Sequence, residues 1–178
     1  LVTLVQLSAG ILGDRNRMSY DAGISYIRNV FEATRTLQKN PDDLDARGII
    51  MMGASLSTSS RLGIGKEEPF AYEIYELEFL PEKLFGSSYR RSLTSVFPRF
   101  LQAMGKHHAD DIRKYYHDAF GFDSSIEESS RKLVELFEGF GVEMYYDGKI
   151  TREQVDAIPC HTELSKEEVF DIINSLIR

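Results

Sequence analysis

Apolar side chains recur every three or four residues along most of this chain, and that spacing constrains the fold more than any other feature. The clearest series lies between residues 19 and 40 and consists of Ile24, Ile27, Val30, Phe31 and Leu37. Residues at this spacing share one face of an α-helix, whereas a half-buried strand needs strict alternation. Further series of the same kind predict an all-α multi-helix bundle; they lie in residues 89–104, 107–120, 124–140 and 165–176.

The first helices have recognisable end signals. Ser19 is a plausible N-cap for a helix that stops at Asn40-Pro41, and Asp42-Asp43 suits the start of the next. That next helix is expected to run to Leu62, before Gly63 and Gly65. Its middle is small and apolar on nearly every face. We therefore expect it to be a central helix that every other helix contacts.

The remaining helices are bounded by prolines and capping signals. The apolar run Leu1–Leu12 fits a buried helix or, less well, a core strand, and its lack of an initial Met suggests that the start is a cut. Pro69 opens a helix that Pro81 should end, and Pro98 predicts a bend or a restart within residues 89–104. The capping-box spacing occurs three times, at Ser125/Glu128, Thr151/Gln154 and Ser165/Glu168.

Size, charge and cysteine content limit the classes of function. A chain of 178 residues suits one domain, and a net charge of -7 argues against binding nucleic acid or an anionic membrane. The single cysteine, Cys160, cannot form an internal disulfide. No apolar stretch is long enough to span a membrane, and no basic segment precedes an apolar one as in a signal peptide. We expect a cytoplasmic protein.

Four short motifs resemble functional sites, and each has a simpler interpretation. Gly63–Lys66 lacks the full phosphate-loop frame, and Asp147–Thr151 lacks the ligands of a calcium loop. His107, His108 and His117 do not share a helix face, so we expect no metal site there. We expect these histidines to be solvated instead. Cys160-His161 follows a proline, which indicates a plain loop. The acidic pairs at helix starts, Glu67-Glu68 and Glu127-Glu128, suit the helix dipole.

Several segments, in order, resemble one enzyme family. They are residues 45–56 (DARGIIMMGASL), the Pro-Phe-Ala start at 69–71, residues 92–98 (SLTSVFP) and residues 164–173 (LSKEEVFDII). This succession is similar to the C-terminal helical half, of dehydroquinate synthase-like fold, of the iron-dependent (group III) alcohol dehydrogenases. The resemblance covers essentially the whole chain at low identity.

The resemblance implies a cofactor chemistry that this chain's residues do not match. In the family, a Rossmann-like half binds NAD(P), and one Asp and three His hold Fe²⁺ or Zn²⁺. Those ligand positions fall at Val2, Gln6, Leu77 and Tyr89 here, with Glu78 matching the Glu beside one of the His. Neither Val nor Leu can bind a metal. No cofactor is therefore predicted for this chain, and the nucleotide-binding half is not among its residues.

Three hypotheses follow. The first is a metal-free, non-catalytic relative, or pseudoenzyme, whose partner is a second copy of the chain or a nucleotide-binding half. The second is the C-terminal half of an active NAD(P)-dependent alcohol or aldehyde oxidoreductase, whose nucleotide-binding half precedes Leu1 and whose metal-independent scheme uses Tyr89 or Glu78. The third is an unrelated helical interaction domain.

Overall fold

The computed structural model describes residues 1–13, 16–59 and 70–178, which divide into two compact units. The first unit comprises the described residues of 1–72 and 114–122, and the second comprises residues 73–113 and 123–178. The regular structure of these residues is helical, apart from a parallel bridge between Tyr146 and Ile177. None of the described helices is long and apolar enough to cross a membrane. The all-α prediction is confirmed, while one domain over residues 1–178 stays a prediction.

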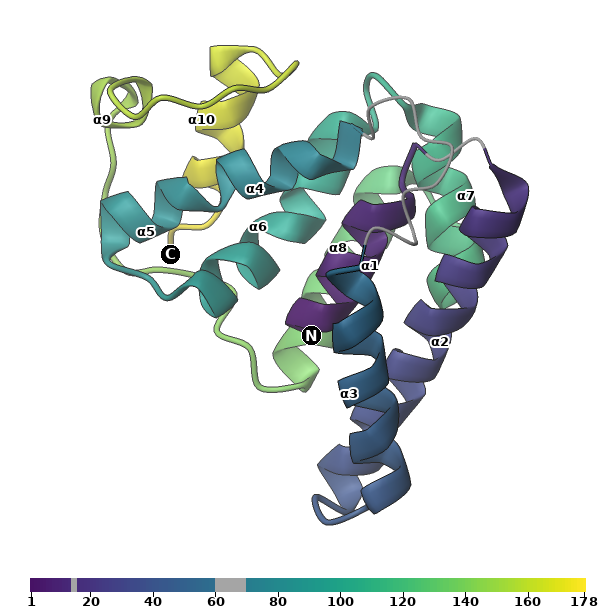
Figure 1. The fold of residues 1–178 in the computed structure, drawn as a ribbon. Coiled ribbons are helices and arrows are strands. Elements are labelled where there is room, and N and C mark those ends of the chain that lie inside the picture. Colours follow the sequence, from purple (N-terminus) through teal and green to yellow (C-terminus); the bar gives the residue numbers. More distant parts are fainter. Residues whose placement is uncertain (14–15, 60–69) are drawn as a thin grey trace. The chain divides into compact units, whose positions relative to one another are not determined.

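The described residues of the first unit form three complete α-helices and the end of a fourth. They are α1 (Val2–Ile11), α2 (Arg17–Lys39), α3 (Leu44–Ser57) and the C-terminal part of α7 (Ala109–Phe120). The helices α2 and α3 run in opposite directions beside each other, and α1 contacts both (Figure 1). Buried side chains line α1, among them Leu4, Val5 and Leu7. The helix interpretation of residues 1–12 is confirmed.

Two helix starts show where local signals succeed and fail. Asp43 caps α3 as predicted, since its carboxylate accepts a hydrogen bond from the Ala46 N–H at 2.9 Å. The predicted N-cap of α2, Ser19, is wrong. Asn16 takes that position, and its Oδ1 accepts from the N–H groups of Met18 (3.1 Å) and Ser19 (3.2 Å). Asn and Ser are equally good caps, so sequence alone could not choose between them.

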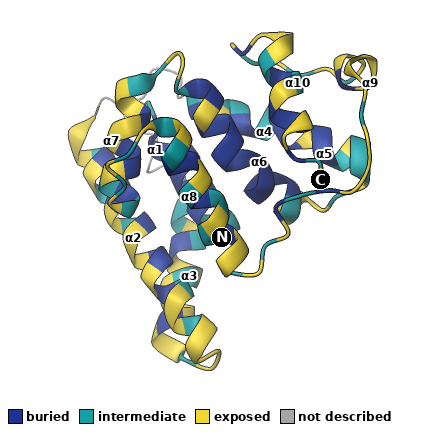
Figure 2. Cartoon of the chain, turned by 180° about the vertical axis from the view of Figure 1, so that it is seen from behind, coloured by how far each residue is buried: buried dark blue, intermediate teal, exposed yellow. Residues whose placement is uncertain are grey.

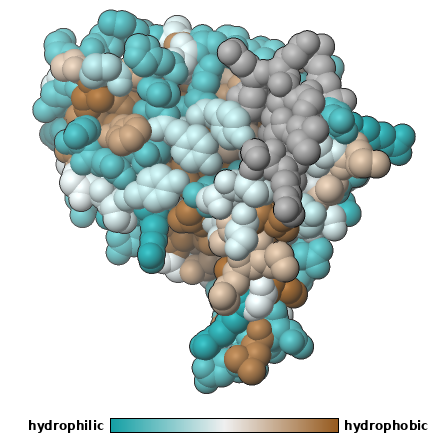
Figure 3. Space-filling model, viewed as in Figure 1, coloured by the Kyte–Doolittle hydropathy of each residue, from teal (hydrophilic) through white to brown (hydrophobic). Residues whose placement is uncertain are grey.

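The prediction that α3 is the central helix is wrong. Its buried residues are Ala46 and Gly53, whereas the exposed fractions of Leu44, Met51 and Met52 are 78%, 72% and 64%. Brown and tan side chains accordingly appear on the part of the surface that α3 forms (Figure 3). The helix ends at Ser57 rather than at Leu62, and Gly63 and Gly65 lie outside the described residues. An apolar composition did not guarantee burial here.

Glycines allow the three helices of the first unit to approach closely. A Cβ added at Gly23 of α2 would lie 2.1 Å from Ile11 Cγ2, and one at Gly53 of α3 would lie 2.6 Å from Val30 Cγ2. Both distances are far below van der Waals contact. The packing of α1, α2 and α3 therefore requires a residue without a side chain at these two positions.

The C-terminal part of α7 is attached to the first unit by polar contacts. The Tyr115 hydroxyl lies 2.6 Å from Ser8 Oγ of α1, and burial raises the pKa of this phenol. Tyr20 of α2 donates to the Asp118 carboxylate at 3.1 Å, and Arg28 donates to the Asp118 backbone carbonyl at 2.6 Å. These bonds satisfy polar groups at an otherwise aromatic interface.

The first helices of the second unit are short. A 3-10 turn (Phe70–Glu73), whose last residue begins the second unit, leads into α4 (Ile74–Leu77) and α5 (Phe79–Phe85). The prediction that Pro81 ends a helix is wrong, because Pro81 lies in the first turn of α5, where a missing N–H costs no helical bond. The helix ends instead at Gly86, whose φ of +64° favours glycine. Pro69 lies outside the described residues.

The buried helix of the second unit is α6 (Tyr89–Met104), with the predicted bounds. It runs through Pro98 without restarting and contacts α4, α5, α8 and α10. Nearly all of it is coloured as buried in Figure 2. Phe97, Phe100 and Leu101 are completely inaccessible. The other helices of this unit pack around α6.

The remaining helices of the second unit are α8 (Ile126–Gly139), α9 (Arg152–Asp156) and α10 (Lys166–Asn174), besides the start of α7. The capping boxes at Thr151/Gln154 and Ser165/Glu168 are confirmed. In each, the cap side chain accepts from the backbone N–H three residues later, and that later residue's side chain accepts from the cap's backbone N–H. At the start of α8 the Ser125 hydroxyl accepts from the Glu128 N–H at 3.2 Å. The Glu128 carboxylate binds Arg131.

Candidate functional site

The two family ligand positions in the first unit lie on α1. Val2 and Gln6 are both half-buried. The Gln6 side-chain carbonyl accepts a hydrogen bond from Ser57 Oγ of α3 at 3.1 Å. The only polar side chain of the pair is therefore engaged in joining α1 to α3.

The other two positions lie in the second unit. Leu77 of α4 is completely buried, and Tyr89 is the first residue of α6, with 38% of its surface exposed. An aliphatic side chain offers no donor, and a neutral phenol is a weak metal ligand. No group of three His, Cys, Asp or Glu that could hold a metal occurs in the part of the chain that the structure describes. The loss of metal ligands stays a prediction.

The residue after Leu77 has an unusual environment. Glu78 joins α4 to α5, only 3% of its surface is exposed, and its Oε2 has no hydrogen-bond partner among the described residues. Burial and, to a smaller extent, the Glu82 carboxylate one turn away together raise the pKa of Glu78 to about 7. At neutral pH this carboxyl group is close to half protonated. It can therefore donate or accept a proton.

A second buried polar atom without a partner belongs to α6. The Ser92 hydroxyl is inaccessible and makes no hydrogen bond within the described residues. Its helix contacts both α4 and α5, between which Glu78 lies. Sequence reasoning singled out Glu78 only through the family motif and missed Ser92. The one available signal for Ser92 was a hydroxyl on the apolar face that carries Val96 and Leu93.

His107 and His108 each contact a different glutamate. His107 Nε2 lies 3.3 Å from Glu168, and His108 Nε2 lies 2.5 Å from Glu163. Both rings contact carboxylates; His107 is exposed, as expected of a solvated histidine, whereas His108 is half-buried. His117 lies on α7, in the first unit. The two paired rings contact different carboxylates, so they share no ligand.

Cys160 lies in a loop, as predicted, and its chemistry is that of an inert thiol. Burial and, to a smaller extent, the carboxylates of Glu76 and Glu73 together raise the pKa of Cys160 to about 11. A thiol with so high a pKa is a poor nucleophile at neutral pH. The neighbouring His161 uses its backbone N–H to bind Glu76 at 3.3 Å.

The other sequence motifs have structural roles or lie outside the described residues. Thr151, the end of the calcium-like run, caps α9. Glu127 and Glu128 lie in the first turn of α8, as expected of charges that suit a helix start. Gly63–Lys66 and Glu67-Glu68 lie outside the described residues. The candidate site therefore reduces to Glu78 and its neighbours.

Comparison with known proteins identifies the fold. No family model and no curated protein matches the chain. Among solved structures, it is similar to NADH-dependent butanol dehydrogenase A from Thermotoga maritima, with a TM-score of 0.80 and 16% sequence identity. The match covers 99% of this chain and 51% of the dehydrogenase chain, so this chain spans about half of its length. The chain has the all-helical fold of the C-terminal half of that protein.

Proposed function

We propose that this chain is the helical half of an alcohol dehydrogenase-like protein, metal-free and non-catalytic by itself. The observation that carries this proposal is a fold match that covers nearly all of this chain but only 51% of a dehydrogenase. In such enzymes the cofactor and the substrate need both halves. A helical half alone supplies packing, positioning or partner contacts.

The residues at the four family ligand positions do not fit iron or zinc. Val2 and Leu77 have no donor atom, Leu77 is completely buried, and the Gln6 carbonyl already binds Ser57. Tyr89 alone would not hold a divalent ion, which needs several converging imidazole or carboxylate ligands. We therefore assign no reaction step to a metal.

Metal binding tests this proposal directly. The purified chain would be exposed anaerobically to Fe²⁺ and to Zn²⁺, desalted and subjected to elemental analysis. We expect less than about one-tenth equivalent of either metal to remain, because the converging donors are missing. Near-stoichiometric retention that is lost in a Gln6→Ala, Tyr89→Phe double variant would overturn the proposal.

A second candidate function is the helical half of an active, metal-independent NAD(P)-linked oxidoreductase. The observation that favours it is Glu78, a buried carboxyl group with an unpaired oxygen and a pKa of about 7, beside the family ligand position at Leu77. Such a group suits proton transfer to or from an alcohol oxygen. The hydride would require a nucleotide-binding half.

The gene sequence upstream of Leu1 separates the two candidates at little cost. A glycine-rich strand-turn-helix segment there would favour the active oxidoreductase, whereas a start codon just upstream would favour the non-catalytic domain. If the longer protein exists, NADH and NADPH oxidation with short aldehydes should be measured for the wild type and for Glu78→Gln. Loss of turnover with unchanged nucleotide binding would support a proton-transfer role.

The proposed partners are a second copy of this chain or a nucleotide-binding half, in the cytoplasm. The formal charge of -7 supports the exclusion of nucleic acid and anionic membranes as partners. Sedimentation equilibrium of the purified chain tests self-association. A monomer at all concentrations would leave the nucleotide-binding half as the proposed partner.

A further inference from the structure

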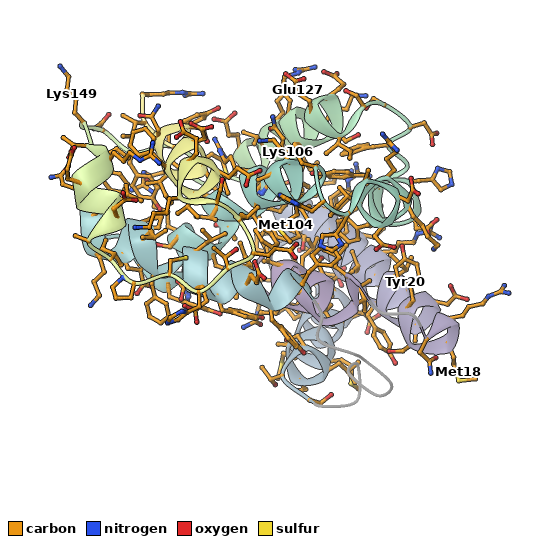
Figure 4. The ribbon with its side chains drawn as sticks, turned by 90° about the horizontal axis from the view of Figure 1, so that it is seen from above. Met18, Tyr20, Met104, Lys106, Glu127 and Lys149 are labelled. Atoms are coloured by element: carbon orange, nitrogen blue, oxygen red, sulfur yellow. The ribbon has the colours of Figure 1, made fainter. Side chains whose placement is uncertain are left out.

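A polar groove lies on the second unit, away from Glu78. It has a volume of about 500 Å³, within the range of small-ligand sites. Its charged lining consists of three arginines and three glutamates: Arg99, Arg131, Arg178, Glu127, Glu135 and Glu138. A second hollow of about 270 Å³ shares Arg99, Gln102 and Ser175 with the groove. Figure 4 labels Glu127 of the groove and Lys106 of the second hollow.

Arg99 is the buried cation of this groove, and Glu138 attracts it without forming a close ion pair. Only 8% of its surface is exposed, and its guanidinium forms no ion pair with any carboxylate of the described residues. Its Nη1 donates to the Ser95 backbone carbonyl at 2.9 Å. Burying a cation is costly, and burial lowers the pKa of Arg99, although Tyr145 and Glu138 oppose this effect. An anion at this position would remove that cost.

The other two arginines of the groove are already paired. Arg131 binds Glu128 at 2.6 Å and also Glu135, and Arg178 lies 3.3 Å from Glu138. These pairs neutralise the two cations locally. Arg99 differs from them because it is buried and has no carboxylate within ion-pair distance among the described residues, which makes it the anchor for a ligand's negative group.

The wall beside Arg99 is held in place before any ligand arrives. Two guanidinium groups contact the Tyr145 ring, with Arg99 Cζ at 4.9 Å and Arg178 Cζ at 3.6 Å from the ring centroid. The backbone of the same segment is bound by Arg91, which donates to the carbonyls of Glu143 (3.2 Å) and Tyr145. A pre-organised site loses less entropy on binding than a mobile one.

The carboxylates on the α8 side limit the class of ligand. Glu127, Glu135 and Glu138 would repel a ligand with two or more negative charges, such as a phosphate dianion. They would attract an ammonium group. We propose that the groove binds a small zwitterion of the amino-acid class, whose carboxylate pairs with Arg99 and whose ammonium group faces Glu138. This site is independent of the function proposed for Glu78.

A titration followed by protein NMR, using 4-aminobutyrate as the probe, tests the proposal. Butyrate, butylamine and inorganic phosphate serve as matched probes that carry only one of the two charges or a different anion. We expect 4-aminobutyrate to bind at least about tenfold more tightly than any of them, because both of its charges find partners. Arg99→Met should weaken this binding by at least about tenfold, whereas Arg99→Lys should retain part of it.

Two further variants keep the test independent of folding. Arg113→Gln removes an exposed arginine that pairs with Asp110, and it should leave binding unchanged. Glu138→Gln should abolish the preference for 4-aminobutyrate over butyrate. Unchanged binding in a folded Arg99→Met variant, equal binding of phosphate, or no binding by the wild type at millimolar concentration would each overturn the proposal.

Discussion

The helices α3 and α6 show that apolar composition and burial are different properties. The sequence of α3 contains two isoleucines and two methionines in succession, yet Met51 and Met52 are exposed. The sequence of α6 contains three arginines, yet most of the helix is buried. The difference lies in the neighbours, because α3 contacts α1 and α2 whereas α6 contacts four helices. Burial is decided by how many elements pack around a helix.

The largest expected contrast between the two helices is in core truncation. Phe97→Ala in α6 removes a completely buried ring, and we expect it to lower the unfolding free energy by about 3–5 kcal/mol. Met52→Ala in α3 should change it by less than about 0.5 kcal/mol, because 64% of that side chain is already exposed. Urea denaturation measures both. Similar losses in the two variants would contradict the contrast.

The next largest effect concerns the buried carboxyl group of the second unit. Between the ordinary pKa of 4.5 and the folded value of about 7, the folded state retains a proton on Glu78 that the unfolded state loses. The unfolding free energy should therefore fall as the pH rises through that window, by about 2–3 kcal/mol from this group alone. Glu78→Gln should remove this component, as urea denaturation at pH 5 and pH 8 would measure. An equal pH dependence in the variant would show that Glu78 ionises freely.

A matched pair of glycines on α3 tests which face of this exposed helix is packed. Gly53→Ala should destabilise the chain by about 1–3 kcal/mol, because the added Cβ would lie 2.6 Å from Val30 Cγ2. Gly48→Ala should stabilise it by about 0.5–1 kcal/mol, because that position has open space and alanine favours the helix. Thermal unfolding measures both changes. Two shifts of the same sign would contradict the packing of α3 against α2.

The smallest effect on stability is expected from the exposed apolar side chains of α3. Replacing Leu44 and Met51 with Gln should change the unfolding free energy by less than about 0.5 kcal/mol, since 78% and 72% of their surfaces are exposed. Exposed apolar side chains favour association, so any self-association of the wild type should weaken in the double variant. Sedimentation velocity measures it. A large loss of stability would mean that α3 is more buried in solution.

Local signals were reliable where one short segment decides the outcome. Thr151 and Ser165 bind the groups that their spacing indicates, and α6 has the predicted bounds. Local sequence signals failed where two helix boundaries were equally compatible with the same short segment. Asn16 and Ser19 are both acceptable caps, and Pro81 is compatible with a helix end or a first turn.

The candidate sites were predictable only in part. Glu78 was found through its place in a family motif, but its raised pKa depends on burial and on Glu82, which no sequence pattern shows. Arg99 appears in the sequence as one charge within the apolar run from Val96 to Leu101. Its significance depends on burial and on the approach of Tyr145 and Glu138, which lie far from it in the sequence.

The sequence by itself determined that this protein is helical, where most of its helices begin and end, and which family of folds it resembles. These properties follow from side chains three to four residues apart and from caps within one turn. The tertiary structure alone decided that α6 is buried and α3 is exposed, that burial raises the pKa of Glu78, and that Arg99 lines a groove. Those outcomes depend on desolvation by residues distant in the chain, which a local pattern does not contain.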